Sequence, residues 1–111
     1  EGLEEFQLDM AGKELVIEFE VAGMHLTAIN AGAEFSFTEA ISLALYCQDQ
    51  AELDYYWEKL SSVAQAEQCG WCKDKYGLSW QIVPSDINEL MLRPGAYKKL
   101  MHMKKITIAD F

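Results

Sequence analysis

The chain has 111 residues, half of them hydrophobic and 24% charged, a composition that predicts one globular domain and not a disordered segment. Its formal net charge is −9, without the clustered Lys and Arg that phosphate binding requires, so neither nucleic acid nor an anionic membrane is an expected partner. No stretch is apolar enough to span a bilayer, and residues 1–10 do not resemble a signal peptide. Three cysteines, an odd number without a compact framework, predict a reducing compartment, and we expect the cytoplasm.

The first half of the chain has the pattern of β-strands. In residues 13–21 apolar side chains alternate with glutamates, which predicts a half-buried antiparallel strand. Ala22 and Gly23 interrupt the pattern, and residues 24–31 are predicted to return as a hairpin partner. Residues 3–10 are predicted as a further strand or an edge. The nearly continuous apolar run within residues 35–47 predicts a central strand.

The periodicity changes after this run. Asp49 and Glu52 have capping-box spacing, and the apolar residues that follow are spaced as on one face of a helix, which predicts a helix over 50–62. Residues 67–74 and 78–84 are predicted as two strands joined by a turn.

The last part of the chain is predicted to be helical. Asp86 and Glu89 repeat the capping-box spacing and predict a short helix over 87–93, and residues 96–103 are predicted as a final helix. The expected architecture is a single α+β domain over residues 1–111 with mostly antiparallel pairing.

Cys69 and Cys72 form a C-x-x-C pair, which suggests redox or zinc chemistry. A redox pair places its first thiol at a helix N-terminus, but this pair falls in a predicted strand, where residues three apart point to opposite faces. A zinc site needs two more ligands, and the remaining cysteine and the histidines lack ligand spacing. We therefore predict that Cys69 faces a cavity or the core and Cys72 the opposite side, although a turn at Gly70 would change this geometry.

Three segments resemble one known family: FSFTEAISLALYCQDQAELDYYWEKLS, EQCGWCKDKYGLSWQIVP and KKLMHMKKITIADF. They are similar to the PhnB-like family, whose members often carry the label 3-demethylubiquinone-9 3-methyltransferase. That family belongs to the vicinal oxygen chelate superfamily, with glyoxalases, bleomycin-resistance proteins and extradiol dioxygenases. The resemblance implies a vicinal oxygen chelate fold, in which βαβββ modules form an incomplete barrel around a ligand cavity.

The resemblance also divides the chain. Residues 1–33 would be the remainder of a first module, residues 34–84 the second module, and residues 85–111 a C-terminal helical tail. The first module lacks its opening strand and helix, which are either outside this sequence or supplied by a partner chain. An unpaired sheet edge of this kind favours a homodimer, with strand exchange as one way to form it.

Metal-dependent relatives bind a divalent ion through His and Glu at four strand positions. The resemblance aligns three of these with Leu26, Ile41 and Gln81, and the fourth falls in the absent strand. Neither hydrocarbons nor a neutral amide suit a hard cation, so the resemblance implies that the metal centre is lost and that no cofactor is bound. A slip of one residue in this alignment would move each side chain to the other face. Methyl transfer is not expected either, because the sequence has no glycine-rich turn of the kind that binds S-adenosylmethionine.

The predicted function is therefore metal-independent binding of a small, partly apolar molecule. The tryptophans would supply apolar walls, the amides would orient the ligand, and the thiol would be a soft wall or a weak donor. The candidate lining residues are Asn30, Cys69, Trp71, Trp80 and Gln81.

Two alternatives remain open. One is a metal-dependent isomerase, lyase or dioxygenase that uses Glu39, His25 and a residue of the missing segment. The other is a structural dimer module with a filled cavity.

Overall fold

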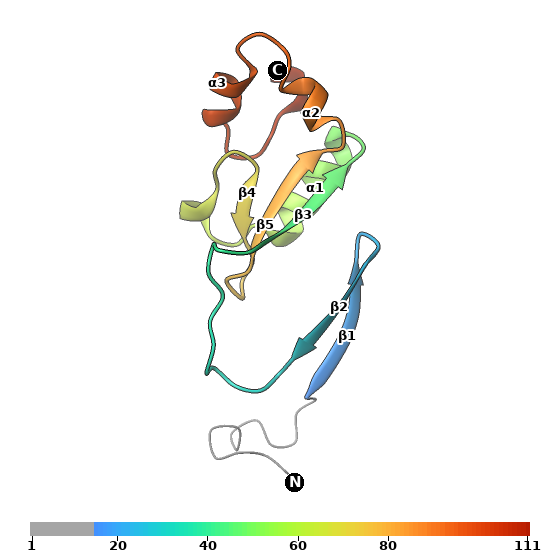
Figure 1. The fold of residues 1–111 in the computed structure, drawn as a ribbon, viewed down its shortest axis with the longest axis vertical. Coiled ribbons are helices and arrows are strands. Elements are labelled where there is room, and N and C mark those ends of the chain that lie inside the picture. The colour runs from blue at the N-terminus through green and yellow to red at the C-terminus, as the bar shows by residue number, and fades with distance from the viewer. Residues whose placement is uncertain (1–14) are drawn as a thin grey trace. The chain divides into compact units, whose positions relative to one another are not determined.

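A computed structural model of the chain describes residues 15–111 and divides the sequence into two compact units, Glu1–Ser36 and Phe37–Phe111 (Figure 1). The strand predicted over residues 3–10 lies outside the described residues. Each unit contains one open β-sheet, and the second also carries the helices, so the fold is of the α+β class. No helix within residues 15–111 combines the length and apolarity needed to cross a membrane.

The first unit contains the predicted hairpin. Strand β1 (Val16–Val21) pairs with the antiparallel strand β2 (Met24–Ile29) through a two-residue turn, in which Ala22 and Gly23 both have positive φ, at 48° and 83°. Such turns match the natural twist of a hairpin. The register places only apolar pairs on one face, whereas the other face carries Glu18, Glu20 and their partners together with the exposed pair Val16 and Ile29. The apolar pairs are Ile17 with Ala28, Phe19 with Leu26, and Val21 with Met24.

The second unit contains a three-stranded sheet in the order β3-β5-β4. Strand β3 (Ser42–Cys47) runs parallel to β5 (Ser79–Pro84), and β4 (Trp71–Lys73) runs antiparallel to it. Two of the three strand pairs among the described residues are antiparallel, which confirms the predicted mostly antiparallel pairing. The prediction of a central strand within residues 35–47 is wrong, because β3 lies at an edge of this sheet. A helix follows β3 and returns the chain to the start of the sheet, as parallel strands require. In the strand order, β5 occupies the centre and β3 an edge.

Helix α1 (Gln50–Leu60) closely matches the predicted helix over 50–62. Its N-cap is Asp49, whose Oδ1 accepts a hydrogen bond from the Glu52 amide at 2.8 Å. Glu52 Oε1 in turn accepts from the amide of Gln48 at 3.1 Å, one residue earlier than a capping box places it. The helix lies behind the sheet in Figure 1 and contacts all three strands, with Leu53 completely buried.

The two sides of this sheet differ in burial. We call the side covered by α1 the closed face, because its alternating side chains are almost fully buried. They include Leu45, Cys47, Cys72, Trp80 and Ile82. We call the other side the open face. Its strand residues are mostly half-buried or exposed: Ser42, Ala44, Tyr46, Trp71, Lys73, Ser79, Gln81 and Val83.

The C-terminal part contains short helices and a bound tail. Besides the 3₁₀ turn η2 (Ala64–Ala66) before β4, the elements are α2 (Ile87–Leu90), α3 (Ala96–Met101) and a 3₁₀ turn, η3 (Ile108–Asp110). The second predicted capping box is wrong, because the Asp86 side chain makes no capping bond and its carbonyl accepts from Glu89 and Leu90 instead.

The segment that follows α3, which we call the tail, is anchored to α1 by the side-chain amide of Gln50. Gln50 Nε2 donates to the Ile106 carbonyl at 3.0 Å, and its Oε1 accepts from the Ile108 amide at 2.8 Å. An ion pair between Lys105 and Asp54, at 2.9 Å, adds to this attachment. The tail is therefore part of the packed unit.

Candidate functional site

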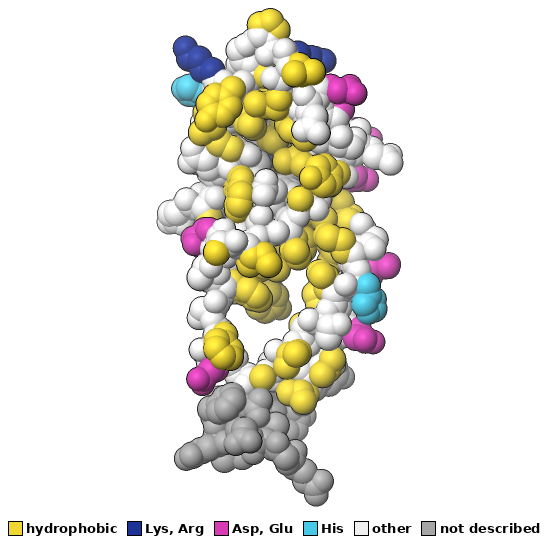
Figure 2. Space-filling model, in the orientation of Figure 1, with side chains coloured by type: hydrophobic (Ala, Val, Ile, Leu, Met, Phe, Trp, Pro, Cys, Tyr) yellow, Lys and Arg dark blue, Asp and Glu magenta, His cyan; other side chains and the backbone are white. Residues whose placement is uncertain are grey.

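The open face brings together two of the five predicted site residues. Trp71 and Gln81 are direct partners across the antiparallel strands β4 and β5, so their side chains lie next to each other on one face. Both are half-buried. Figure 2 shows hydrophobic side chains gathered over the strands on the side of the sheet that faces the viewer, opposite α1. A large aromatic ring beside an amide is an arrangement that can bind and orient a partly apolar molecule.

The amide of Gln81 is held in place by the neighbouring edge strand. Its Nε2 donates to the hydroxyl of Ser42 on β3 at 2.9 Å. Within residues 15–111 its Oε1 accepts no hydrogen bond from the protein, and the Trp71 indole nitrogen donates none. The pair therefore offers one acceptor and one donor to a ligand.

Trp80 lies on the other side of the sheet. It pairs with Cys72 on the closed face, is only 3% exposed, and donates from Nε1 to Asp74 Oδ2 at 2.9 Å. The expectation that Trp71 and Trp80 flank one pocket is therefore wrong, because the register puts them on opposite faces. Trp80 instead connects the core to the β4–β5 turn, where Asp74 also accepts from backbone amides.

Cys69 lies in a turn and not in the predicted strand over 67–74. Residues Gln68 and Trp71 bond to each other across a two-residue turn, with φ of 53° at Cys69 and 86° at Gly70. The amides of Cys69 and Gly70 donate to carbonyls of the tail, at Met103 and Lys104, both at 2.8 Å. The structure thus contains a turn at Gly70 in place of the predicted strand. This turn places Cys69 beside the tail, with its Sγ 3.7 Å from Sδ of Met101.

All three cysteines are free. Burial, together with smaller contributions from the nearby carboxylates of Glu67 and Asp74, raises the pKa of the Cys72 thiol to about 12. Burial likewise raises the pKa of Cys47 to about 11, with Glu52 and Asp49 adding to it. Both thiols are therefore protonated at neutral pH, the opposite of an activated nucleophile.

Asn30, the remaining predicted residue, belongs to the first unit. It follows β2 and is half-buried, and its backbone N–H donates to the Leu15 carbonyl at 2.6 Å. The other four predicted residues belong to the second unit.

The positions aligned with metal ligands have ordinary structural surroundings. Leu26 pairs with Phe19 on the apolar face of the hairpin, and Ile41 is 60% exposed just before β3. His25 lies 3.8 Å from Glu18. Over residues 15–111, no three His, Cys, Asp or Glu side chains gather closely enough to hold a metal ion.

The sequence analysis did not select Lys73, which also lies on the open face. It is two residues from Trp71 on β4, so strand alternation puts both on the same side, a signal already present in the sequence. Its ammonium group forms an ion pair with Glu39. The hydrogen bond from Lys73, with smaller contributions from a backbone hydrogen bond and from the lysine charge, lowers the pKa of Glu39.

A comparison with protein families matches residues 3–83 to the family described as 3-demethylubiquinone-9 3-methyltransferase. The chain belongs to this family. The family is part of the glyoxalase-like, vicinal oxygen chelate superfamily, so the resemblance based on the sequence motifs is confirmed. A comparison with curated proteins gives no significant match.

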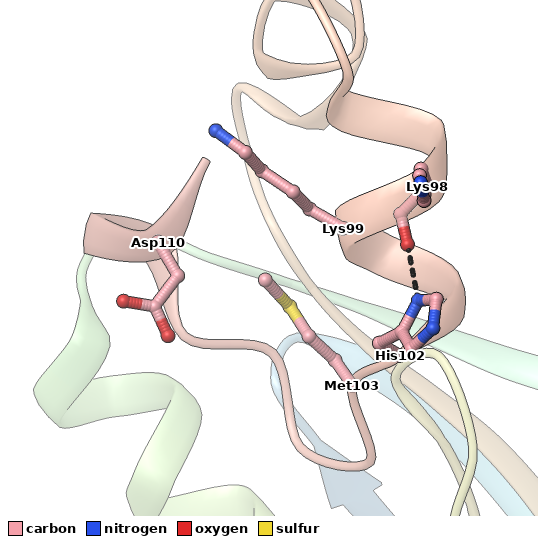
Figure 3. Close-up of a pocket in the computed structure, with 5 residues that line it drawn as sticks. All are labelled: Lys98, Lys99, His102, Met103 and Asp110. Atoms are coloured by element: carbon pink, nitrogen blue, oxygen red, sulfur yellow. Dashed lines mark hydrogen bonds between the residues drawn. The ribbon is translucent and has the colours of Figure 1, made fainter.

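A hollow of about 420 Å³ lies in the C-terminal part, beyond the residues that match the family (Figure 3). Met103 lies between Asp110 on one side and His102 on the other. His102 Nδ1 is 2.8 Å from the Lys98 carbonyl, so this nitrogen carries the proton. The hollow is lined by Lys98, Lys99, His102, Met103 and Asp110, and it contains none of the predicted site residues.

Proposed function

We propose that this chain is a small-molecule-binding domain of the glyoxalase-like superfamily and that it binds a partly apolar ligand on the open face. The observation that carries the proposal is the pairing of Trp71 with Gln81 across β4 and β5. Trp71 would stack on the apolar part of the ligand, and the Gln81 amide would accept a hydrogen bond from its polar part. We also place the domain in the cytoplasm, the reducing compartment that its odd number of cysteines predicts.

Tryptophan fluorescence tests this proposal in a Trp57→Phe background, which removes the emission of the helix residue. A panel of small aromatic and aliphatic metabolites should include compounds that change the emission of this variant. The same compounds should give no change when Trp71→Phe is added, because only the buried Trp80 then emits. An unchanged emission across the whole panel would overturn the proposal.

We propose that binding does not use a metal ion. The positions that would supply ligands carry Leu26, Ile41 and Gln81, and the amide nitrogen of Gln81 is already bonded to Ser42. Metal analysis of purified protein should find far less than one divalent ion per chain. A stoichiometric ion would instead favour a metal-dependent enzyme of the same superfamily.

Methyl transfer is not part of the proposal, although the family description names it. Only Gln48 and Asp49 separate β3 from α1, so the turn after this parallel strand has no glycine. Cofactors with phosphate or methionine groups usually need a glycine-rich turn there.

We further propose that the domain is completed as a homodimer, with the apolar face of the β1–β2 hairpin packed against a second copy. A two-stranded hairpin alone is marginally stable in water, and Ile17 and Phe19 on this face remain 42% and 41% exposed. Both strands are also edges, which can pair with another chain by strand exchange. Sedimentation should find a dimer, and Phe19→Ser should shift it to monomer, whereas Glu18→Ser on the other face should not. A monomeric wild type would contradict this part.

A further inference from the structure

Lys73 provides a positive charge beside the proposed ligand surface. It is the register partner of Ser79 on β5, directly along the strand from Trp71. Its side chain is only 25% exposed, and its ammonium group is paired with the carboxylate of Glu39. The chain as a whole is acidic, with a formal net charge of −9, but Lys73 gives this face a local positive charge.

The counter-charge comes from a segment with few attachments. Glu39 is 69% exposed and lies in residues 32–41, all of which are exposed and outside any helix or strand. Glu39 lies three residues before β3, so the ion pair connects the segment before one edge strand to the other edge strand, β4. Because an exposed ion pair contributes little free energy, another anion can compete with Glu39 for Lys73.

We propose that Lys73 anchors the anionic group of the ligand and that Glu39 is a displaceable counter-ion that takes its place in the free protein. This inference rests on the proposed function, since it concerns the same open face. It identifies the ligand class as a small aromatic or apolar molecule with one carboxylate or similar anion. Residues two apart on a strand are about 6–7 Å apart, so the anion and the apolar part should be separated by a short chain of three or four carbons.

The test compares two probes that differ in charge alone, 4-phenylbutyrate and 4-phenylbutyramide, followed by Trp71 emission in the Trp57→Phe protein. The anion should bind about fivefold more tightly than the amide, because only the anion can pair with Lys73. Glu39→Gln should tighten binding of the anion by about threefold and leave the amide unchanged, because the competing carboxylate is removed. Lys73→Met should abolish the preference for the anion, and Lys73→Arg should retain it.

Lys75→Gln is the matched control for net charge. It removes one positive charge from the β4–β5 turn, where the ammonium group lies 5.2 Å from the centre of the Tyr76 ring, and should not alter the preference. Equal affinity of the two probes, unchanged by Glu39→Gln, would overturn the inference and leave the proposed function intact. If neither probe changes the emission, both the proposed function and the inference fail. Thermal unfolding of each variant checks that it is folded.

Discussion

The two faces of the β3-β5-β4 sheet carry side chains from alternating residues of the same strands, but these side chains differ in burial and in hydrogen bonding. On the closed face, Trp80 is 3% exposed and its indole N–H is bonded to Asp74, and Cys72 is buried as a protonated thiol. On the open face, the indole N–H of Trp71 and the side-chain amide oxygen of Gln81 have no hydrogen-bond partner among the described residues, and the Lys73 ammonium group is paired with an exposed glutamate. The closed face therefore supplies stability, and the open face retains groups that can bind a ligand.

The largest expected difference between the faces concerns two adjacent residues of β5. Ile82 is completely buried on the closed face, so Ile82→Ala should lower the free energy of unfolding by about 3–4 kcal/mol. Val83 is half-buried on the open face, and Val83→Ala should cost about 1 kcal/mol. Urea denaturation of both variants measures the difference, and similar losses would show that the faces are not distinct in packing.

The turn before β4 gives the next largest effect. Gly70 has φ of 86°, and a Cβ there would lie 2.8 Å from Ile106 Cδ1, so Gly70→Ala should cost about 2–3 kcal/mol. Gly77 has nearly the same φ, 88°, but nothing lies within 4 Å of its Cβ position, so Gly77→Ala should cost about 1 kcal/mol. Equal losses in thermal unfolding would mean that contact between this turn and the tail contributes no stability.

The two strand tryptophans allow a smaller but direct comparison. Trp80→Phe removes the hydrogen bond to Asp74 and leaves a small cavity, so we expect a loss of about 1–2 kcal/mol. Trp71→Phe should change stability by less than about 0.5 kcal/mol, since the ring is half-buried and its nitrogen has no protein partner. Chemical denaturation followed by circular dichroism checks both, and a larger loss for Trp71→Phe would reverse our assignment of the faces.

The smallest effect depends on pH. Because the pKa of Cys72 is about 12 when folded and 9.0 ordinarily, the unfolded chain loses this proton first as the pH rises. The contribution of the protonated Cys72 thiol to the free energy of unfolding is fully present below pH 9. Above pH 9 this contribution decreases, by about 1 kcal/mol at pH 10. The stability of Cys72→Ala should therefore fall less steeply between pH 8 and 10 than that of the wild type. Identical slopes in denaturation at each pH would contradict the burial of this thiol.

Much of the local structure could be predicted because the sequence pattern is regular. Alternation predicted the β1–β2 hairpin, and the spacing after Asp49 predicted α1 almost to its ends. The turn at Cys69 and Gly70 could not be predicted in this way, because it depends on hydrogen bonds to the tail more than 30 residues later in the chain. A long-range contact of this kind leaves no local pattern.

The site was only partly predictable, for a related reason. Trp71, Trp80 and Gln81 were all predicted to line one site, but the face of each strand tryptophan depends on the register between β4 and β5. That register is set by the turn after Lys73, where Asp74 Oδ1 accepts from two amides. A shift of one residue would have placed Trp80 on the open face instead.

The most direct test of the difference between the faces is a titration followed through the indole N–H resonances of the three tryptophans by NMR. Single Trp→Phe variants assign the signals, and 4-phenylbutyrate serves as the probe. Our account predicts that the Trp71 signal moves progressively with added probe while the Trp80 signal, bonded to Asp74 on the closed face, stays in place. A Trp80 signal that moves while that of Trp71 does not, or three signals that remain unchanged, would contradict it.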